Sequence, residues 1–120
     1  MIILKRRSLG GVLLGTTVCA LVGLRGGAAQ EPRTHRVDIR AFAFEPDELT
    51  IAVGDTVEWI NHDLASHTAT EMDGAWDTGE LAKGDVQSVR FDRPAQLDYF
   101  CAFHPHMRGR VTIAAPRRCS

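Results

Sequence analysis

The sequence predicts an all-β domain, a β-sandwich made of two packed sheets. In the 120-residue chain, several short segments alternate apolar and polar residues with a period of two, as half-buried strands do. Turns rich in Gly, Pro and Asp separate these segments. After residue 29, no segment carries a helical period of apolar residues over three turns. Short alternating strands joined by frequent turns are typical of a two-sheet sandwich.

After the first predicted strand, the apolar residues shift from odd-numbered to even-numbered positions. Val37 and Ile39 alternate with charged residues, whereas Phe42 and Phe44 fall on the opposite parity, so we expect a bulge or bend near Ala41. Further predicted strands cover residues 49–53, 57–59, 87–91, 97–101 and 111–113. The polar stretch 70–85, rich in Gly and Asp, is predicted to be a long loop.

Residues 1–29 have the composition of an export signal. Lys5, Arg6 and Arg7 form a basic start, residues 9–24 form a Gly-rich apolar core, and small residues place the cleavage after Ala29. The pair Arg6-Arg7 resembles a twin-arginine signal, and an ordinary secretory signal is the alternative. We therefore predict a signal peptide at 1–29, one domain at 30–120 and a periplasmic location. The apolar core is too short for stable membrane insertion.

The charge of the exported part bears on its partners. Residues 1–29 contain four basic and no acidic residues, so cleavage leaves a mildly acidic chain. Such a surface argues against nucleic acid as a partner. Two cysteines remain after cleavage, Cys101 and Cys119. In an oxidising compartment they could pair as a disulfide. The residues around Cys101 favour a metal site instead, which leaves Cys119 as a spare thiol.

Three metal donors follow one another at three-residue steps: Cys101, His104 and Met107. A thiolate, an imidazole and a weak thioether belong to the donor set of type 1 copper, which needs one more imidazole. His67 is the best candidate, although it is far from Cys101 in the sequence. It can join the site only if the sandwich brings two loops to one end. These donors suit both Cu(I) and Cu(II), so little has to move when an electron arrives or leaves.

Other uses of these residues fit less well. Covalent haem attachment would need a second cysteine in a Cys-x-x-Cys-His motif. Structural zinc would prefer another Cys or His to Met107. A Cys/His nucleophile would need an exposed thiolate, whereas Cys101 shares the inward parity of Leu97 and Tyr99.

Residues 37–113 resemble the cupredoxins, and among them the amicyanins. The matching pieces are Gly54-Asp55-Thr56-Val57-Glu58-Trp59-Ile60-Asn61, His67, Asp98-Tyr99-Phe100-Cys101, His104-Pro105-x-Met107-Arg108-Gly109 and Val111. The resemblance implies a Greek-key sandwich and one copper ion bound by His67, Cys101, His104 and Met107. It also implies that the side chain of Asn61 ties the two ligand loops together. Phe103 and His106 stand where amicyanins have a proline and an aromatic residue, which leaves the ligand set intact.

The resemblance further implies a protein that carries single electrons and is not an enzyme. Transient partners, a dehydrogenase or a c-type cytochrome, would dock around the ring edge of His104, on a face that includes Pro105, His106 and Ala65. We expect a monomer. The main rival function is a periplasmic carrier or buffer that delivers copper. A multicopper enzyme would need a second cluster of histidines, and the remaining ones are scattered.

The other aromatic and histidine residues receive weaker predictions. His35, His62 and His106 are predicted to be solvated. The alternatives are a supporting role beside the metal ligands for His62 and binding of adventitious metal for His106. Trp59 lies on the buried parity of its strand and is predicted to pack in the core. Trp76, in the polar stretch, either caps the sandwich or contributes to a partner surface.

Overall fold

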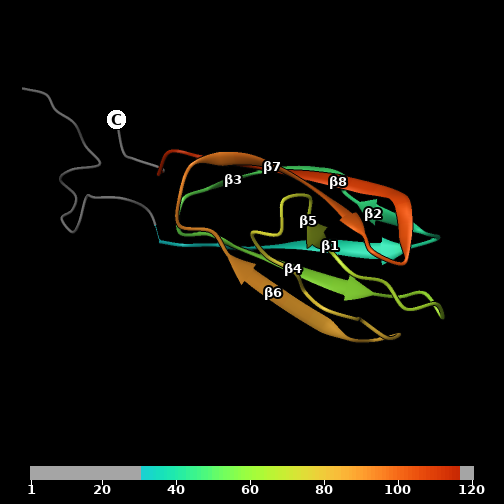
Figure 1. The fold of residues 1–120 in the computed structure, drawn as a ribbon. Coiled ribbons are helices and arrows are strands. Elements are labelled where there is room, and N and C mark those ends of the chain that lie inside the picture. The colour runs from blue at the N-terminus through green and yellow to red at the C-terminus, as the bar shows by residue number, and fades with distance from the viewer. Residues whose placement is uncertain (1–30, 117–120) are drawn as a thin grey trace, which may run out of the picture. The chain divides into compact units, whose positions relative to one another are not determined.

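Two four-stranded sheets make up the computed structural model, which describes residues 31–116 (Figure 1). The first sheet contains, in order, β2 (Ala43–Glu45), β1 (Thr34–Arg40), β4 (Thr56–Asn61) and β6 (Val86–Arg90). The second contains β3 (Glu48–Ala52), β8 (His104–Ala114), β7 (Ala95–Cys101) and β5 (Thr70–Glu71). The described residues contain strands and no helix, so the predicted all-β sandwich is confirmed. The predicted signal peptide and Cys119 lie outside the described residues.

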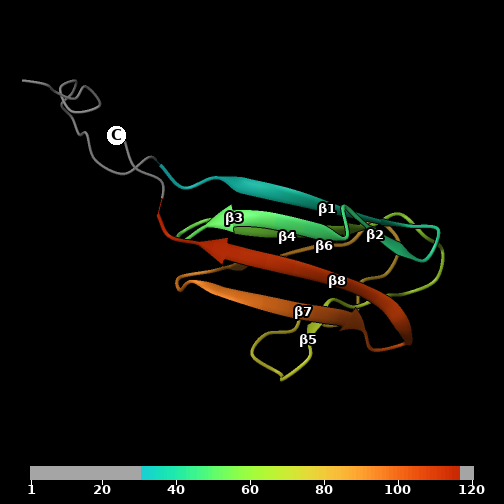
Figure 2. The same cartoon turned by 90° about the horizontal axis from the view of Figure 1, so that it is seen from above.

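The chain crosses repeatedly between the two sheets. β1 pairs in parallel with β4, and β3 pairs in parallel with β8. Parallel neighbours cannot be joined by a tight hairpin, so each pair requires a crossover connection. In Figures 1 and 2, β1, β4 and β7 run toward one end of the sandwich, opposite the end where the described chain begins and finishes. No helix within residues 31–116 is long and apolar enough to cross a membrane.

The core lies between the sheets and follows the predicted strand parity. In β4 every second residue is buried, and Trp59 is completely inaccessible to solvent, as predicted. The ring of Trp76 packs against that of Trp59, with 5.1 Å between centroids, so of the two alternatives for Trp76 the structure supports packing on the sandwich. The buried apolar residues are Val37, Ile39, Phe44, Ile51, Ala52, Val57, Trp59, Ala69, Leu81, Phe91, Tyr99, Cys101, Met107, Val111 and Ile113.

The predicted bend near Ala41 is confirmed and is a tight hairpin turn. Arg40 of β1 pairs with Ala43 of β2, which leaves only Ala41 and Phe42 between the strands. Both residues have left-handed backbone conformations, with φ of 52° and 58°. This conformation matches the twist of a two-residue hairpin, but it is usually taken by Gly, Asn or Asp. A branched or bulky side chain there costs about 1–2 kcal/mol.

Two histidines that we expected to be solvated instead contact carboxylates. Nε2 of His35 lies 2.9 Å from Oδ2 of Asp55, a completely buried side chain. Nε2 of His62 lies 2.8 Å from Oδ1 of Asp38. The His35 side chain is 23% exposed and that of His62 is 35% exposed, so the prediction of solvated side chains holds only in part. The parallel pairing of β1 with β4 brings each histidine to its carboxylate, and the sequence shows no sign of that pairing.

The hairpin of β7 and β8 depends on a close contact at Gly109. Gly109 pairs with Tyr99 across the hairpin, and both residues are buried. A Cβ atom at Gly109 would lie 2.5 Å from the phenol oxygen of Tyr99 and closer still to the ring. Glycine is thus required here by space.

We predict that Gly109→Ala destabilises the protein by about 1–3 kcal/mol, because the added methyl group overpacks against Tyr99. Urea unfolding of the metal-free protein measures the change. Tyr99→Leu should remove part of the clash, so the double variant should cost less than the sum of the two single changes. Additive costs would contradict this explanation.

Candidate metal centre

The β7–β8 hairpin brings two donors together. Cys101 is the last residue of β7 and His104 is the first of β8, and the two residues pair across the turn. The turn is tighter than the loop expected from the sequence, because only Ala102 and Phe103 lie between the strands. Met107 therefore belongs to β8, on the buried parity of that strand, with 3% of its surface exposed.

The third donor comes from the segment that follows β4. The main chain of His67 exchanges two hydrogen bonds with Leu81, and its side chain is completely buried. Nδ1 of His67 and Nδ1 of His104 each lie 3.6 Å from Sγ of Cys101. The donor atoms of the three residues all lie within 4.8 Å of one another. The expectation that the fold brings the segments of His67 and Cys101 together at one end is confirmed.

The spacing of the three donors fits a single metal ion. Ligand distances of 2.0–2.3 Å at angles near 120° place sulfur and nitrogen donors about 3.7 Å apart. The sulfur–nitrogen separations in the structure agree with this value. Two imidazoles and a thiolate in this arrangement are the equatorial donors of a type 1 copper site.

Asp63 sets the orientation of the His67 ring. Its Oδ2 lies 2.9 Å from Nε2 of His67 and accepts the hydrogen bond from that N–H, which leaves Nδ1 free to bind a metal. The same carboxylate accepts hydrogen bonds from the main-chain N–H groups of Ala41 and Phe42. Desolvation is the largest single influence and raises the pKa of Asp63, but these hydrogen bonds together outweigh it and hold the pKa below its ordinary value. Asp63 is thus an anion whose hydrogen bonds connect the ring of His67 to the turn at Ala41 and Phe42.

Asn61 organises the segment of His67 and does not reach the other ligand segment. Its Nδ2 donates to the carbonyl oxygens of Ala65 and Leu81, both at 2.8 Å, and its Oδ1 accepts from the N–H of Asp63. The resemblance implied that Asn61 ties the two ligand loops together. That expectation is wrong, since these bonds all hold the His67 segment.

Thr68 provides the link between the two ligand segments. Its main-chain N–H donates to Sγ of Cys101 at 3.4 Å, and its Oγ1 accepts from the N–H of Ala102 at 2.8 Å. The hydroxyl of Thr68 also contacts that of Thr70, which donates to Asp77. A hydrogen bond to the cysteine sulfur is one of the contacts that tune the potential of a type 1 site. The only sequence signal for this role was the position of Thr68 directly after His67.

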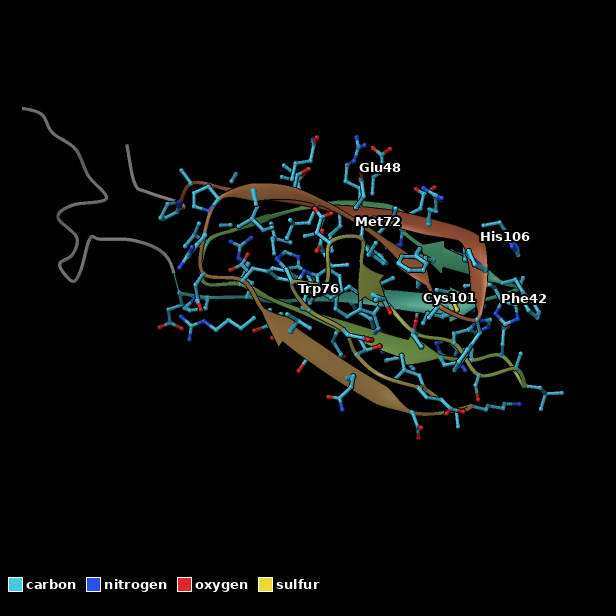
Figure 3. All side chains as sticks on the ribbon, in the orientation of Figure 1. Phe42, Glu48, Met72, Trp76, Cys101 and His106 are labelled. Atoms are coloured by element: carbon cyan, nitrogen blue, oxygen red, sulfur yellow. The ribbon has the colours of Figure 1, made fainter. Side chains whose placement is uncertain are left out.

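The outer face of the centre is apolar. Of the residues expected on a docking face, Pro105 and His106 are exposed, as predicted for His106, and Ala65 is half-buried. Sequence reasoning missed Phe42, which is 45% exposed and whose ring contacts those of both His67 and His104. Figure 3 shows Phe42, Cys101 and His106 at the same end of the fold.

Comparison with known proteins identifies the family. Residues 33–114 match the model of the copper-binding proteins of the plastocyanin/azurin family. The chain belongs to this family. Because the family binds copper and the three donors fit a type 1 site, the metal of this cupredoxin is copper.

Individual relatives agree with this assignment. Amicyanin of Paracoccus denitrificans is 37% identical over 84 residues, which are 64% of this chain and 63% of that protein. The chain thus spans a little under two thirds of that relative. A mutant of amicyanin in its oxidised state has a TM-score of 0.64 at 33% identity, covering 67% of this chain and 81% of that one. A copper-containing nitrite reductase from Thermus scotoductus SA-01 has the same TM-score at 30% identity, but only 24% of that chain is covered.

We predict that Thr68→Val lowers the stability of the metal-free cupredoxin by about 1–3 kcal/mol, because the N–H of Ala102 loses its acceptor while the main-chain contact to sulfur remains. Thr68→Ser keeps the hydroxyl and is the matched control. Denaturant unfolding of both variants measures the difference. Equal stability of the two variants would show that the hydroxyl bond does not hold the ligand segments together.

A second prediction concerns Asp38, which joins β1 to the segment after β4. The hydrogen bond from His62, followed by the hydrogen bond and charge of Arg36, holds the pKa of Asp38 below its ordinary 3.8, against desolvation. A lowered folded-state pKa contributes stability that is present above 3.8 and is lost as the pH falls through the folded value. Since Asp38 is partly exposed, we expect less than about 1 kcal/mol. Asp38→Asn should therefore be less stable than the parent near pH 5, and the gap should close toward pH 2.5. A gap that persists in acid would contradict the assignment.

Proposed function

We propose that this cupredoxin is a periplasmic carrier of single electrons, with His67, Cys101, His104 and Met107 as its copper ligands. The observation that carries the proposal is the preformed cluster of one thiol and two imidazoles at the end of a rigid sandwich. When bound, copper supplies the one-electron couple Cu(I)/Cu(II). The burial of Met107 on β8 supports its role as the fourth, weakly binding ligand.

In this function the protein holds the donor atoms in fixed positions and shields them from water. The paired strands hold Cys101 and His104, and the main-chain bonds to Leu81 hold His67. Complete burial of Cys101 and His67 excludes water from the sulfur and one imidazole. Because the donor set suits both oxidation states, the ligands can stay in place when an electron moves.

His104 is the proposed exit for the electron. It is half-buried, whereas His67 is completely enclosed, so only His104 presents ring atoms to a partner. The surrounding Pro105, His106 and Ala65 would form the docking face, and the arginines of β8 would steer transient partners. By the family resemblance, these partners are a dehydrogenase or a c-type cytochrome, and the carrier works as a monomer.

We infer no enzymatic role. Within residues 31–116, His67, Cys101 and His104 form the single cluster of His, Cys and acidic side chains spaced to hold a metal. A multicopper enzyme would need a further centre for its substrate.

Loading the exported form with Cu(II) tests the proposal. We expect an intense thiolate-to-copper absorption band in the visible range and an unusually small copper hyperfine splitting. Cys101→Ser should lose both signals with its fold preserved, and Cys119→Ser should keep them. Electron self-exchange should be fast compared with the loss of copper. Weakly coloured copper that is released rapidly to a partner would instead indicate a delivery protein.

A further inference from the structure

The two-residue turn between β1 and β2 requires a left-handed backbone, and here it is formed by two residues that are strained in that conformation. Ala41 and Phe42 both adopt left-handed backbone conformations, and a glycine or asparagine would take either place at lower cost. A residue held in such a region persists only where its surroundings determine it, and such residues cluster at functional sites. Phe42 is also 45% exposed, so burial in the core does not account for it.

One carboxylate holds this turn and a copper ligand at the same time. Oδ1 of Asp63 accepts the N–H of Ala41 at 2.8 Å, and Oδ2 accepts the N–H of Phe42 at 2.9 Å. Oδ2 also accepts Nε2–H of His67 at 2.9 Å. The position of the turn and the orientation of the imidazole are therefore determined by the same side chain.

The turn places the ring of Phe42 in contact with the imidazole rings of His67 and His104. The centroid of Phe42 lies 5.1 Å from that of His67 with an interplanar angle of 88°, and 4.9 Å from that of His104 with an angle of 87°. Both contacts have the edge-to-face geometry that aromatic rings prefer. In Figure 3, Phe42 lies at the end of the fold, just beyond Cys101. A single side chain thus covers both histidines from outside the sandwich.

We propose that the Ala41–Phe42 turn, fastened by Asp63, is a clasp that holds the two ligand imidazoles in place and slows the departure of copper. For copper to leave, at least one imidazole has to swing away from the ion. His104 is half-buried and has the easier path, and the ring of Phe42 stands against it. The clasp rests on the proposed function, because it assigns Phe42 and Asp63 as positioning residues of that same centre.

The test compares exposed apolar side chains in the copper-loaded exported protein. Phe42→Ala removes the clasp, and Met72→Ala is the matched control, since Met72 is 46% exposed and lies outside the turn between Cys101 and His104. An excess of a chromogenic copper chelator reports released copper independently of the blue band. We expect Phe42→Ala to release copper at least tenfold faster than the parent, which is about 1.4 kcal/mol in activation free energy. Met72→Ala should stay within about twofold of the parent.

Two further variants separate positioning from general stability. Phe42→Gly relieves the backbone strain, so the metal-free protein should unfold at a higher denaturant concentration while copper leaves faster. A purely structural role would move both quantities in the same direction. Asp63→Asn weakens the bonds to the turn and to His67, and its effect on release should be less than additive with that of Phe42→Ala.

The outcomes distinguish the clasp from the proposed function. Equal rates of copper release for the parent, Phe42→Ala and Met72→Ala, with a normal blue spectrum, would overturn the clasp and leave the electron carrier standing. Additive effects of Phe42→Ala and Asp63→Asn would also overturn it, since the two residues would then act separately. A parent that binds copper without the blue spectrum would overturn the proposed function, whatever the release rates.

Discussion

The contact between one sulfur and two imidazole nitrogens is the constraint on which the rest of the structure depends. The sulfur and one imidazole come from the two ends of a two-residue turn, and the other imidazole comes from a segment that is distant in the sequence. Neither segment could hold this geometry alone. The register of β7 with β8 places Cys101 opposite His104, and the bridge to Leu81 places His67. The sheets therefore act as a frame that brings the segments within reach.

Three polar side chains turn this approximate placement into a defined one. Asn61 bonds to the main chain within the His67 segment, Thr68 joins that segment to the cysteine turn, and Asp63 fixes the ring of His67. Irregular main chain near a buried site leaves N–H and C=O groups without strand partners, and each would cost free energy if left unpaired. The same bonds that satisfy these groups also orient the ligands. Stability of the loops and precision of the site thus have a common origin.

Sequence reasoning correctly predicted the features that depend on the local pattern of residues. The alternation along β4 and β7 predicted that Trp59, Tyr99 and Cys101 point inward, and the spacing of donors identified His104 and Met107. Apart from the meeting of His67 with Cys101, it missed the contacts that depend on pairing between distant segments. The contacts of His62 with Asp38 and of Phe42 with both ligand histidines join residues that share no periodic pattern. Asn61 lies beside the metal centre as expected, but its side chain bonds only to the segment of His67 and to Leu81. In this chain it is Thr68 that links the two ligand segments.

The proposed role as an electron carrier places two opposing requirements on the metal site. Retention favours covering every ligand, whereas transfer requires at least one ligand to approach the partner closely. This chain treats its two histidines differently: His67 is completely buried and bonded to Asp63, and His104 is left half-exposed. Phe42 contacts both rings edge-on, yet nearly half of its own surface stays open. An aromatic side chain in this position can restrain His104 and still bring a π-system to the proposed docking face. This explains why the strained turn presents a large flat ring, where a glycine would have made the turn itself more stable.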